Sequence, residues 1–129
     1  ISSSGTISFP STVDFKNNPD LAQMFAFLAA TLGEKLELTG LDNLRIKETD
    51  RIAALKTELE KLGVSVMVDG NSMTVSGKVS VPKTQISTYN DHRMAMSATV
   101  LSSIIPTEIM NPEVVVKSYP GFWSALEVL

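Results

Sequence analysis

Basic side chains stand at three places where the sequence predicts the start of a helix. The N-terminus of a helix carries partial positive charge, so a Lys or Arg there costs a few tenths of a kcal/mol, up to about 1. Helix starts that accept this cost commonly bind an anion, such as a phosphate or a carboxylate. The sequence therefore predicts one site for a small anionic ligand, at which the basic residues are Lys47, Arg51, His92, Arg93 and Lys117.

The composition limits the class of protein. With 129 residues, 43% of them hydrophobic, the chain is one domain or part of a larger one. Its net charge of −3 argues against a nucleic-acid surface, which is normally basic. There is no cysteine and only one histidine, His92, which excludes disulfides, thiolate chemistry and a zinc site built on several histidines. No apolar run is long enough to cross a bilayer, so we expect a cytoplasmic protein that binds neither nucleic acid nor membrane.

The spacing of the apolar residues predicts an α/β fold in which one order of elements occurs twice. The first set comprises an extended segment at 1–15, a helix at 18–33, a strand at 35–39, a helix at about 48–62 and a hairpin formed by 64–68 and 72–75. The second set comprises a strand at 86–88, a helix at 91–105, a strand at 107–110, a strand or loop at 114–116 and a helix at 119–129. The second set lacks a closing hairpin.

Equivalent residues of the two sets lie about 70 positions apart. Asp91 comes 71 positions after Asp20, and both open apolar helices; Lys117 comes 70 positions after Lys47, and both precede a helix. Such spacing is typical of an internal repeat. We predict one unit at residues 1–78 and a second, incomplete unit at 79–129, and we expect the chain to be a piece of a longer protein.

The charged segment from Lys47 to Arg51 has two interpretations. In a helix, Lys47 and Arg51 would share a face, where they would hold an anion while Glu48 transfers a proton. Alternatively, the segment is a solvated helix end whose ion pairs contribute only ~0–1 kcal/mol each. Composition alone favours the second interpretation.

Two acidic residues at predicted helix starts also have alternative roles. Asp91 is suited to cap the helix that follows it, and Asp20, directly after Pro19, is favoured by the helix dipole. Both placements are sufficient structural explanations. Asp20 is also a candidate proton acceptor, and the residue types alone leave its role open.

Three segments closely resemble signature segments of 5-enolpyruvylshikimate-3-phosphate synthase, the 3-phosphoshikimate 1-carboxyvinyltransferase family. They are Leu44 to Arg51, Asn90 to Met96 and Val116 to Pro120, and their order and separation also fit that family. The resemblance extends over about residues 14–126. It implies two globular halves, each built from three βαβαββ units, of which this chain is similar to about two units of the C-terminal domain. The unit boundaries predicted above from spacing are compatible with that architecture.

The resemblance implies an enzyme of the shikimate pathway, which serves aromatic amino-acid biosynthesis. Such an enzyme transfers the enolpyruvyl group of phosphoenolpyruvate to the 5-hydroxyl of shikimate 3-phosphate and releases phosphate. No metal or organic cofactor is implied. By resemblance, the catalytic residues are Asp20 and Glu48, the ligands of shikimate 3-phosphate are Asp20, Asn43 and Lys47, and the ligands of phosphoenolpyruvate are Arg51, Arg93 and Lys117, with His92 beside them. The sequence departs from the family at Leu21-Ala22-Gln23, where many members have Ala-Ala-Met-Thr.

Two other functions compete with this interpretation. One is a non-enzymatic αβ repeat module that binds a protein partner through its exposed strand edges. The other is an enolpyruvyl transferase that acts on a UDP-sugar, although that sister family does not share the Lys-Glu-Thr-Asp-Arg string. If the chain is the C-terminal part of the synthase, its N-terminal half is an obligatory partner, and we expect the isolated chain to be inactive.

Overall fold

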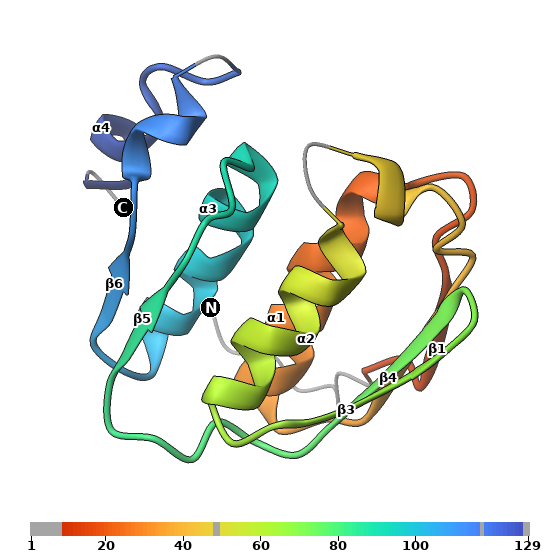
Figure 1. Ribbon diagram of the computed structural model, residues 1–129. Coiled ribbons are helices and arrows are strands. Elements are labelled where there is room, and N and C mark those ends of the chain that lie inside the picture. The colour runs from red at the N-terminus through yellow and green to blue at the C-terminus, as the bar shows by residue number, and fades with distance from the viewer. Residues whose placement is uncertain (1–8, 48–49, 117, 128–129) are drawn as a thin grey trace, which may run out of the picture.

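The computed structural model describes residues 9–47, 50–116 and 118–127. A four-stranded sheet is covered on one face by two helices that lie side by side, and a two-stranded parallel sheet follows with a third helix against it (Figure 1). This arrangement confirms the predicted α/β class. In the part of the chain that is described, no helix has both the length and the apolar character to span a membrane.

The four-stranded sheet has the order β1-β2-β4-β3. Its strands are β1 (Thr12–Asp14), β2 (Leu36–Thr39), β3 (Ser65–Asp69) and β4 (Ser72–Ser76). Strand β2 is parallel to β1 and antiparallel to β4, and Leu38 is paired with Val13 on one side and Met73 on the other. Strands β3 and β4 form the predicted hairpin. Leu36 and Leu38 are buried while Glu37 between them is exposed, so the side chains alternate between core and solvent.

The first helix begins and ends at the predicted residues. Pro19 opens a 3-10 turn, η1 (Pro19–Leu21), which continues as α1 (Ala22–Leu32). Gly33 ends the helix with φ of 74°, a left-handed conformation that glycine adopts without a steric penalty.

The second helix begins later than predicted. A 3-10 turn, η2 (Leu44–Ile46), precedes α2 (Arg51–Lys61), and Asp50 caps α2 by accepting a hydrogen bond from the Ala53 N–H at 3.1 Å. Lys47 has extended backbone angles and lies before the cap. The prediction that Lys47 and Arg51 share a helical face was therefore wrong.

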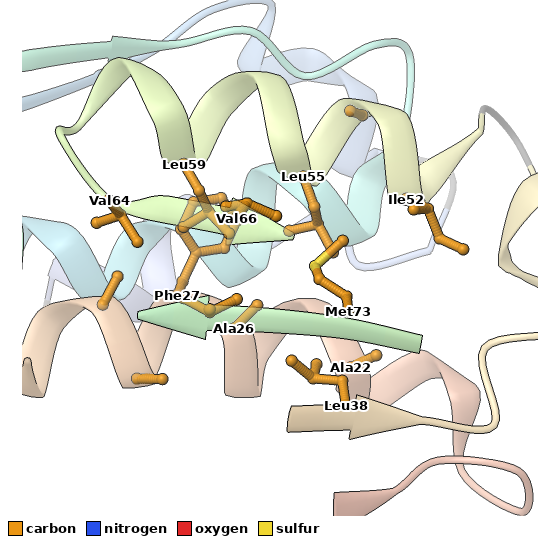
Figure 2. Close-up of a cluster of buried hydrophobic side chains, with 14 of the residues drawn as sticks. Ala22, Ala26, Phe27, Leu38, Ile52, Leu55, Leu59, Val64, Val66 and Met73 are labelled. Atoms are coloured by element: carbon orange, nitrogen blue, oxygen red, sulfur yellow. The ribbon is translucent and has the colours of Figure 1, made fainter. Parts of the chain in front are cut away.

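The core lies between the sheet and its two helices. Leu55 and Leu59 of α2 point toward the sheet and toward Phe27 of α1 (Figure 2). All three side chains are fully buried, as is Met73 of β4. Burial of one such side chain stabilises the fold by about 1.5–3 kcal/mol. This contact fixes the position of α2, and hence of Arg51 at its first turn.

The second part of the chain has the same order of elements as the first up to its second helix. It contains β5 (Thr84–Ile86), α3 (His92–Ala98), η3 (Thr99–Ser103), β6 (Thr107–Ile109), η4 (Pro112–Val115) and α4 (Phe122–Glu127). Strands β5 and β6 are parallel, with Ile86 paired to Ile109, as β1 and β2 are parallel in the first part. The unit boundary at residue 78 stays a prediction.

Helix α3 is shorter than the predicted helix at 91–105. After Ala98 the chain tightens into η3, where hydroxyl groups donate to backbone carbonyls three residues earlier, at 2.7 Å each. These side-chain bonds compete with the regular helical pattern. The donors are Thr99, Ser102 and Ser103. The segment at 114–116, predicted as strand or loop, belongs mainly to the 3-10 turn η4.

Gly40 shapes the turn between β2 and η2, and its replacement tests this turn. Its φ is 70°, and a Cβ at this position would overlap Asp14 Oδ1 and lie 2.7 Å from the Lys16 nitrogen. Gly70 also has a positive φ, of 58°, but no atom lies within 4 Å of its Cβ position. We expect Gly70→Ala to cost about 1 kcal/mol for the left-handed conformation alone. We expect Gly40→Ala to cost about 3 kcal/mol or more, because the overlap adds to that strain.

Urea unfolding of the two variants and of the parent chain measures these losses. Equal losses for Gly40→Ala and Gly70→Ala would contradict the close approach of Gly40 to Asp14.

Candidate functional site

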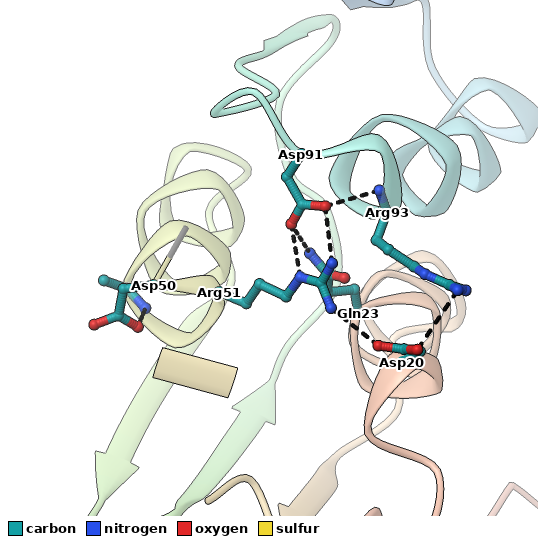
Figure 3. Close-up of polar contacts among 7 residues, drawn as sticks. Asp20, Gln23, Asp50, Arg51, Asp91 and Arg93 are labelled. Carbon is teal, nitrogen blue, oxygen red and sulfur yellow. Dashed lines mark hydrogen bonds and ion pairs between the residues drawn. The ribbon is translucent and has the colours of Figure 1, made fainter. Parts of the chain in front are cut away.

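A buried arginine forms the centre of the candidate site. Arg51 is the first residue of α2, and its side chain is only 1% exposed. Its Nε donates to Asp91 Oδ2 at 2.8 Å, and its Nη2 donates to Asp91 Oδ1 at 3.1 Å (Figure 3). Two parallel bonds of this kind are the strongest geometry for a guanidinium and a carboxylate. The pair joins α2 to the start of α3.

Asp20 lies between Arg51 and a second arginine. Arg51 Nη1 donates to Asp20 Oδ1 at 3.1 Å, and Arg93 Nη2 lies 3.5 Å from Asp20 Oδ2 (Figure 3). The Asp20 side chain is 44% exposed and that of Arg93 is 41% exposed, whereas Asp91 is fully buried. The structure thus brings together three of the predicted site residues, and the side that faces solvent is formed by Asp20 and Arg93.

The starts of helices position the carboxylates. Asp91 precedes α3 and accepts a hydrogen bond from the Arg93 N–H at 2.9 Å, so the predicted capping role is confirmed. Asp20 is in the first turn of η1, and Asp50 caps α2. A carboxylate is favoured at a helix N-terminus and a cation is not. The nearby carboxylates offset the unfavourable placement of Arg51 in the first turn of α2.

Gln23 is a member of this cluster that the sequence analysis did not identify. It lies on α1, is fully buried, and donates from Nε2 to Asp91 Oδ2 at 3.2 Å. Its Oε1 has no hydrogen-bond partner among the described residues. With this bond, Asp91 accepts from α1, α2 and its own helix at once. The departure from the family pattern at Gln23 was the available signal for an unusual contact.

Asn43 and Lys47 lie before α2, on either side of η2. Both residues are exposed, and η2 packs against α2. Within the described residues, neither side chain forms a hydrogen bond or an ion pair with Asp20, Arg51 or Arg93. Glu48 and Lys117, which the sequence analysis assigned to the same site, lie outside the described residues.

His92, in the first turn of α3, borders a cavity of about 870 Å³. The cavity lies between the loop before α3 and the segment around η4. It is lined by Tyr89, Asn90, His92, Asn111, Glu113, Val114 and Ser118. Among residues 9–47, 50–116 and 118–127, no group of three or more acidic or histidine side chains is placed to hold a metal ion.

Comparison with known proteins identifies the family. The family model described as EPSP synthase (3-phosphoshikimate 1-carboxyvinyltransferase) matches residues 3–126. The chain belongs to the EPSP synthase family. Among curated relatives named 3-phosphoshikimate 1-carboxyvinyltransferase, that of Bacteroides fragilis is 47% identical over 118 residues, and that of Laribacter hongkongensis is 38% identical over 119 residues. These matches cover 88% and 92% of this chain but only 28% of either relative.

Solved structures of EPSP synthases have the same fold. An EPSP synthase from Acinetobacter baumannii superimposes with a TM-score of 0.72 at 26% sequence identity, covering 84% of this chain and 26% of that chain. A second EPSP synthase structure from that organism superimposes with a TM-score of 0.67. The chain therefore spans between a quarter and a third of the length of the family members that it matches.

Replacement of Asp91 tests the buried ion pair. Asp91→Asn keeps the size of the side chain and one acceptor oxygen, but it leaves the Arg51 guanidinium without its buried countercharge. We expect a loss of about 3–5 kcal/mol in the free energy of unfolding. The control is Glu60→Gln. It also removes one negative charge, but from an exposed ion pair with Lys56 on α2. That exposed pair contributes only about 0.3–0.5 kcal/mol.

Urea unfolding of both variants checks this expectation. A loss for Asp91→Asn no larger than that for Glu60→Gln would contradict a buried, charged pair.

Proposed function

We propose that the chain forms the C-terminal part of the active site of a 3-phosphoshikimate 1-carboxyvinyltransferase. The enzyme transfers the enolpyruvyl group of phosphoenolpyruvate to the 5-hydroxyl of shikimate 3-phosphate. The observation that carries this proposal is the placement of the Asp20 carboxylate between Arg51 and Arg93 in a member of the EPSP synthase family. The name of the relatives favours shikimate 3-phosphate over a UDP-sugar as acceptor.

The phosphoenolpyruvate subsite, in this proposal, is formed by Arg93 and by the side of Arg51 that faces Asp20. The contact between Arg93 and Asp20 is long, at 3.5 Å, and both groups are partly exposed. An exposed pair of this kind contributes only ~0–1 kcal/mol, so an anionic ligand can replace Asp20 at Arg93 with little loss. Asp91 is fully buried and keeps Arg51 oriented meanwhile. Lys117 completes this subsite.

The proposed chemistry has an addition step and an elimination step. The 5-hydroxyl oxygen of shikimate 3-phosphate adds to C2 of phosphoenolpyruvate, Asp20 accepts the hydroxyl proton, and Glu48 donates a proton to the methylene carbon C3. This gives a tetrahedral intermediate. The bond between C2 and the phosphate oxygen then breaks, C3 returns a proton to Glu48, and phosphate leaves with the proton that Asp20 had accepted. Cations around a site from which water is excluded stabilise the charge that develops on the phosphate.

Shikimate 3-phosphate, in this proposal, lies near the N-terminus of α2, beside the turn η2. Asn43 supplies a hydrogen bond, and Lys47 supplies a cation for the phosphate group. The Lys47 ammonium has no ion pair with another described residue, so no carboxylate among the described residues competes with the ligand for it. We place the enzyme in the cytoplasm, with the N-terminal half of the synthase supplying the rest of the cleft.

Replacement of Arg93 tests the phosphoenolpyruvate subsite. In a full-length synthase that carries these residues, we expect Arg93→Ala to raise the KM for phosphoenolpyruvate at least about tenfold, because a charge-assisted contact with the ligand is lost. Lys56→Ala is the matched control. It removes one positive charge from a side chain that is as exposed as that of Arg93 but lies on α2, five residues after Arg51. We expect this control to leave the KM unchanged. An equal effect of both variants would contradict a specific contact and indicate a general effect of charge.

The isolated chain provides a second test. We expect it to show no turnover, because half of the proposed cleft lies on the missing part of the enzyme. An NMR titration with shikimate 3-phosphate and then phosphoenolpyruvate should still shift the amide signals of Asp20, Asn43, the segment 47–51, Arg93 and Lys117 more than inorganic sulfate does. Turnover by this chain would contradict the need for the N-terminal half. Shifts equal to those caused by sulfate would contradict a preformed half-site.

A further inference from the structure

Glu58 is a buried carboxylate that has no role in the proposed chemistry. It lies on α2, and its side chain is only 1% exposed. It accepts hydrogen bonds from the Ser87 N–H at 3.0 Å and the Tyr89 hydroxyl at 2.5 Å, and Lys61 Nζ lies 2.6 Å away. A buried charge is costly unless it is paired and hydrogen-bonded, and these three donors satisfy that need.

Two of the three donors belong to the loop between β5 and α3, which has an unusual backbone. Tyr89 and Asn90 have φ values of 55° and 56°, in the left-handed region that residues other than glycine rarely adopt. A residue in a sparsely populated conformation costs about 1–3 kcal/mol and persists only when its surroundings hold it. Glu58 binds the loop at Ser87 and at Tyr89, and the Thr88 hydroxyl between them donates to the Met110 carbonyl oxygen at 2.9 Å, so both contacts hold the loop at its start.

Helix α2 holds the same loop at its other end through Arg51. Arg51 and Glu58 are seven residues apart, which is about two helical turns, or about 10 Å, on one face of α2. Arg51 binds Asp91, the last residue before α3, while Glu58 binds residues two and four positions earlier. One rigid helix thus fixes both ends of a five-residue segment.

We infer that Glu58 is a positioning residue for the anion site: by holding the loop before α3, it places Asp91 against Arg51 and Arg93 beside Asp20. Glu58 touches neither proposed substrate. It acts through the loop before α3. The last residue of that loop, Asp91, orients Arg51, and the helix that follows, α3, carries Arg93. Its effect on catalysis rests on the function proposed above, but its effect on the geometry of the Arg51 contact does not.

The contact with Glu58 has a consequence for the Tyr89 hydroxyl. Burial, the hydrogen bond to Glu58 and the negative charge of Glu58, in that order, raise the pKa of Tyr89 to about 12. The hydroxyl therefore stays protonated, and able to donate, across the pH range in which the enzyme would work.

The test uses Glu58→Gln in a full-length synthase that carries these residues. This change keeps the size of the side chain and one acceptor oxygen, but it removes the charge and weakens the hold on the loop. We expect the KM for phosphoenolpyruvate to rise about tenfold while the KM for shikimate 3-phosphate stays within about twofold. Asp20 is held on η1, Asn43 and Lys47 flank η2, and among the described residues none of these three forms a hydrogen bond or ion pair with residues 87–91. Glu60→Gln, the same change at an exposed position of α2, should alter neither KM.

A merely structural role gives a different result. Loss of folded protein lowers the apparent kcat and leaves both KM values unchanged, so unchanged KM values in Glu58→Gln would overturn the inference. An equal rise of both KM values would overturn it too. If Glu58→Gln does not fold, Tyr89→Phe replaces it, because this variant removes one bond to the loop and keeps the pair between Glu58 and Lys61. For Tyr89→Phe we expect a rise of about threefold in the KM for phosphoenolpyruvate alone.

A readout without substrates separates this inference from the proposed function. In the parent protein we expect an NMR signal from the Arg51 Nε–H, protected from exchange by its bond to buried Asp91. In Glu58→Gln that signal should broaden or exchange faster, and in Glu60→Gln it should not. If the full-length protein that carries these residues shows no synthase activity, the proposed function fails and this signal alone decides: an unchanged signal in Glu58→Gln overturns the inference, and a broadened one supports it.

Discussion

The buried ion pair between Arg51 and Asp91 is the interaction on which the candidate site depends. It joins α2 of the first part of the chain to α3 of the second, and Gln23 of α1 adds a third attachment to the same carboxylate. A buried pair of this kind contributes little net stability compared with apolar packing, but loss of one partner is strongly destabilising. Its main effect is therefore on geometry. Helices that could pack in several registers are restricted to the register in which guanidinium and carboxylate meet.

The site has a buried side and an exchangeable side, and the difference follows from solvent exposure. Asp91 and Arg51 are shielded from water, so their mutual attraction is strong and persistent. Asp20 and Arg93 are more than 40% exposed, and solvent screens their contact. In the proposed function, an anionic ligand competes with Asp20 without disturbing Asp91. Arg51 contacts both carboxylates, so in that proposal the ligand site changes occupancy while the helix packing stays fixed.

Local signals predicted much of the fold, and long-range contacts account for what they missed. Pro19 and Gly33 bounded the first helix correctly because each acts through its own backbone. The hairpin β3-β4 followed from alternating apolar residues. The burial of Arg51 was not predictable, because its neighbours are charged and its partner lies 40 positions away. Glu58 was missed for the same reason, since a carboxylate one turn before Lys61 is typical of an exposed helix.

The repetition of elements explains why two carboxylates meet one guanidinium. Asp20 and Asp91 lie 71 positions apart, and each is at the start of the first helix in its own set of elements. Packing of α1 against α3 brings these two helix starts to the same end of the fold, where α2 also begins (Figure 1). A carboxylate is favoured at each helix start, and a cation between two carboxylates is favoured by both. Arg51 is unfavourable for the dipole of its own helix, α2. It is stabilised by Asp20 and Asp91, which the dipoles at the starts of the other two helices favour. The two carboxylates differ in burial and in partners: Asp91 is fully buried and accepts two bonds from Arg51 and one from Gln23, whereas Asp20 is 44% exposed and lies between Arg51 and Arg93.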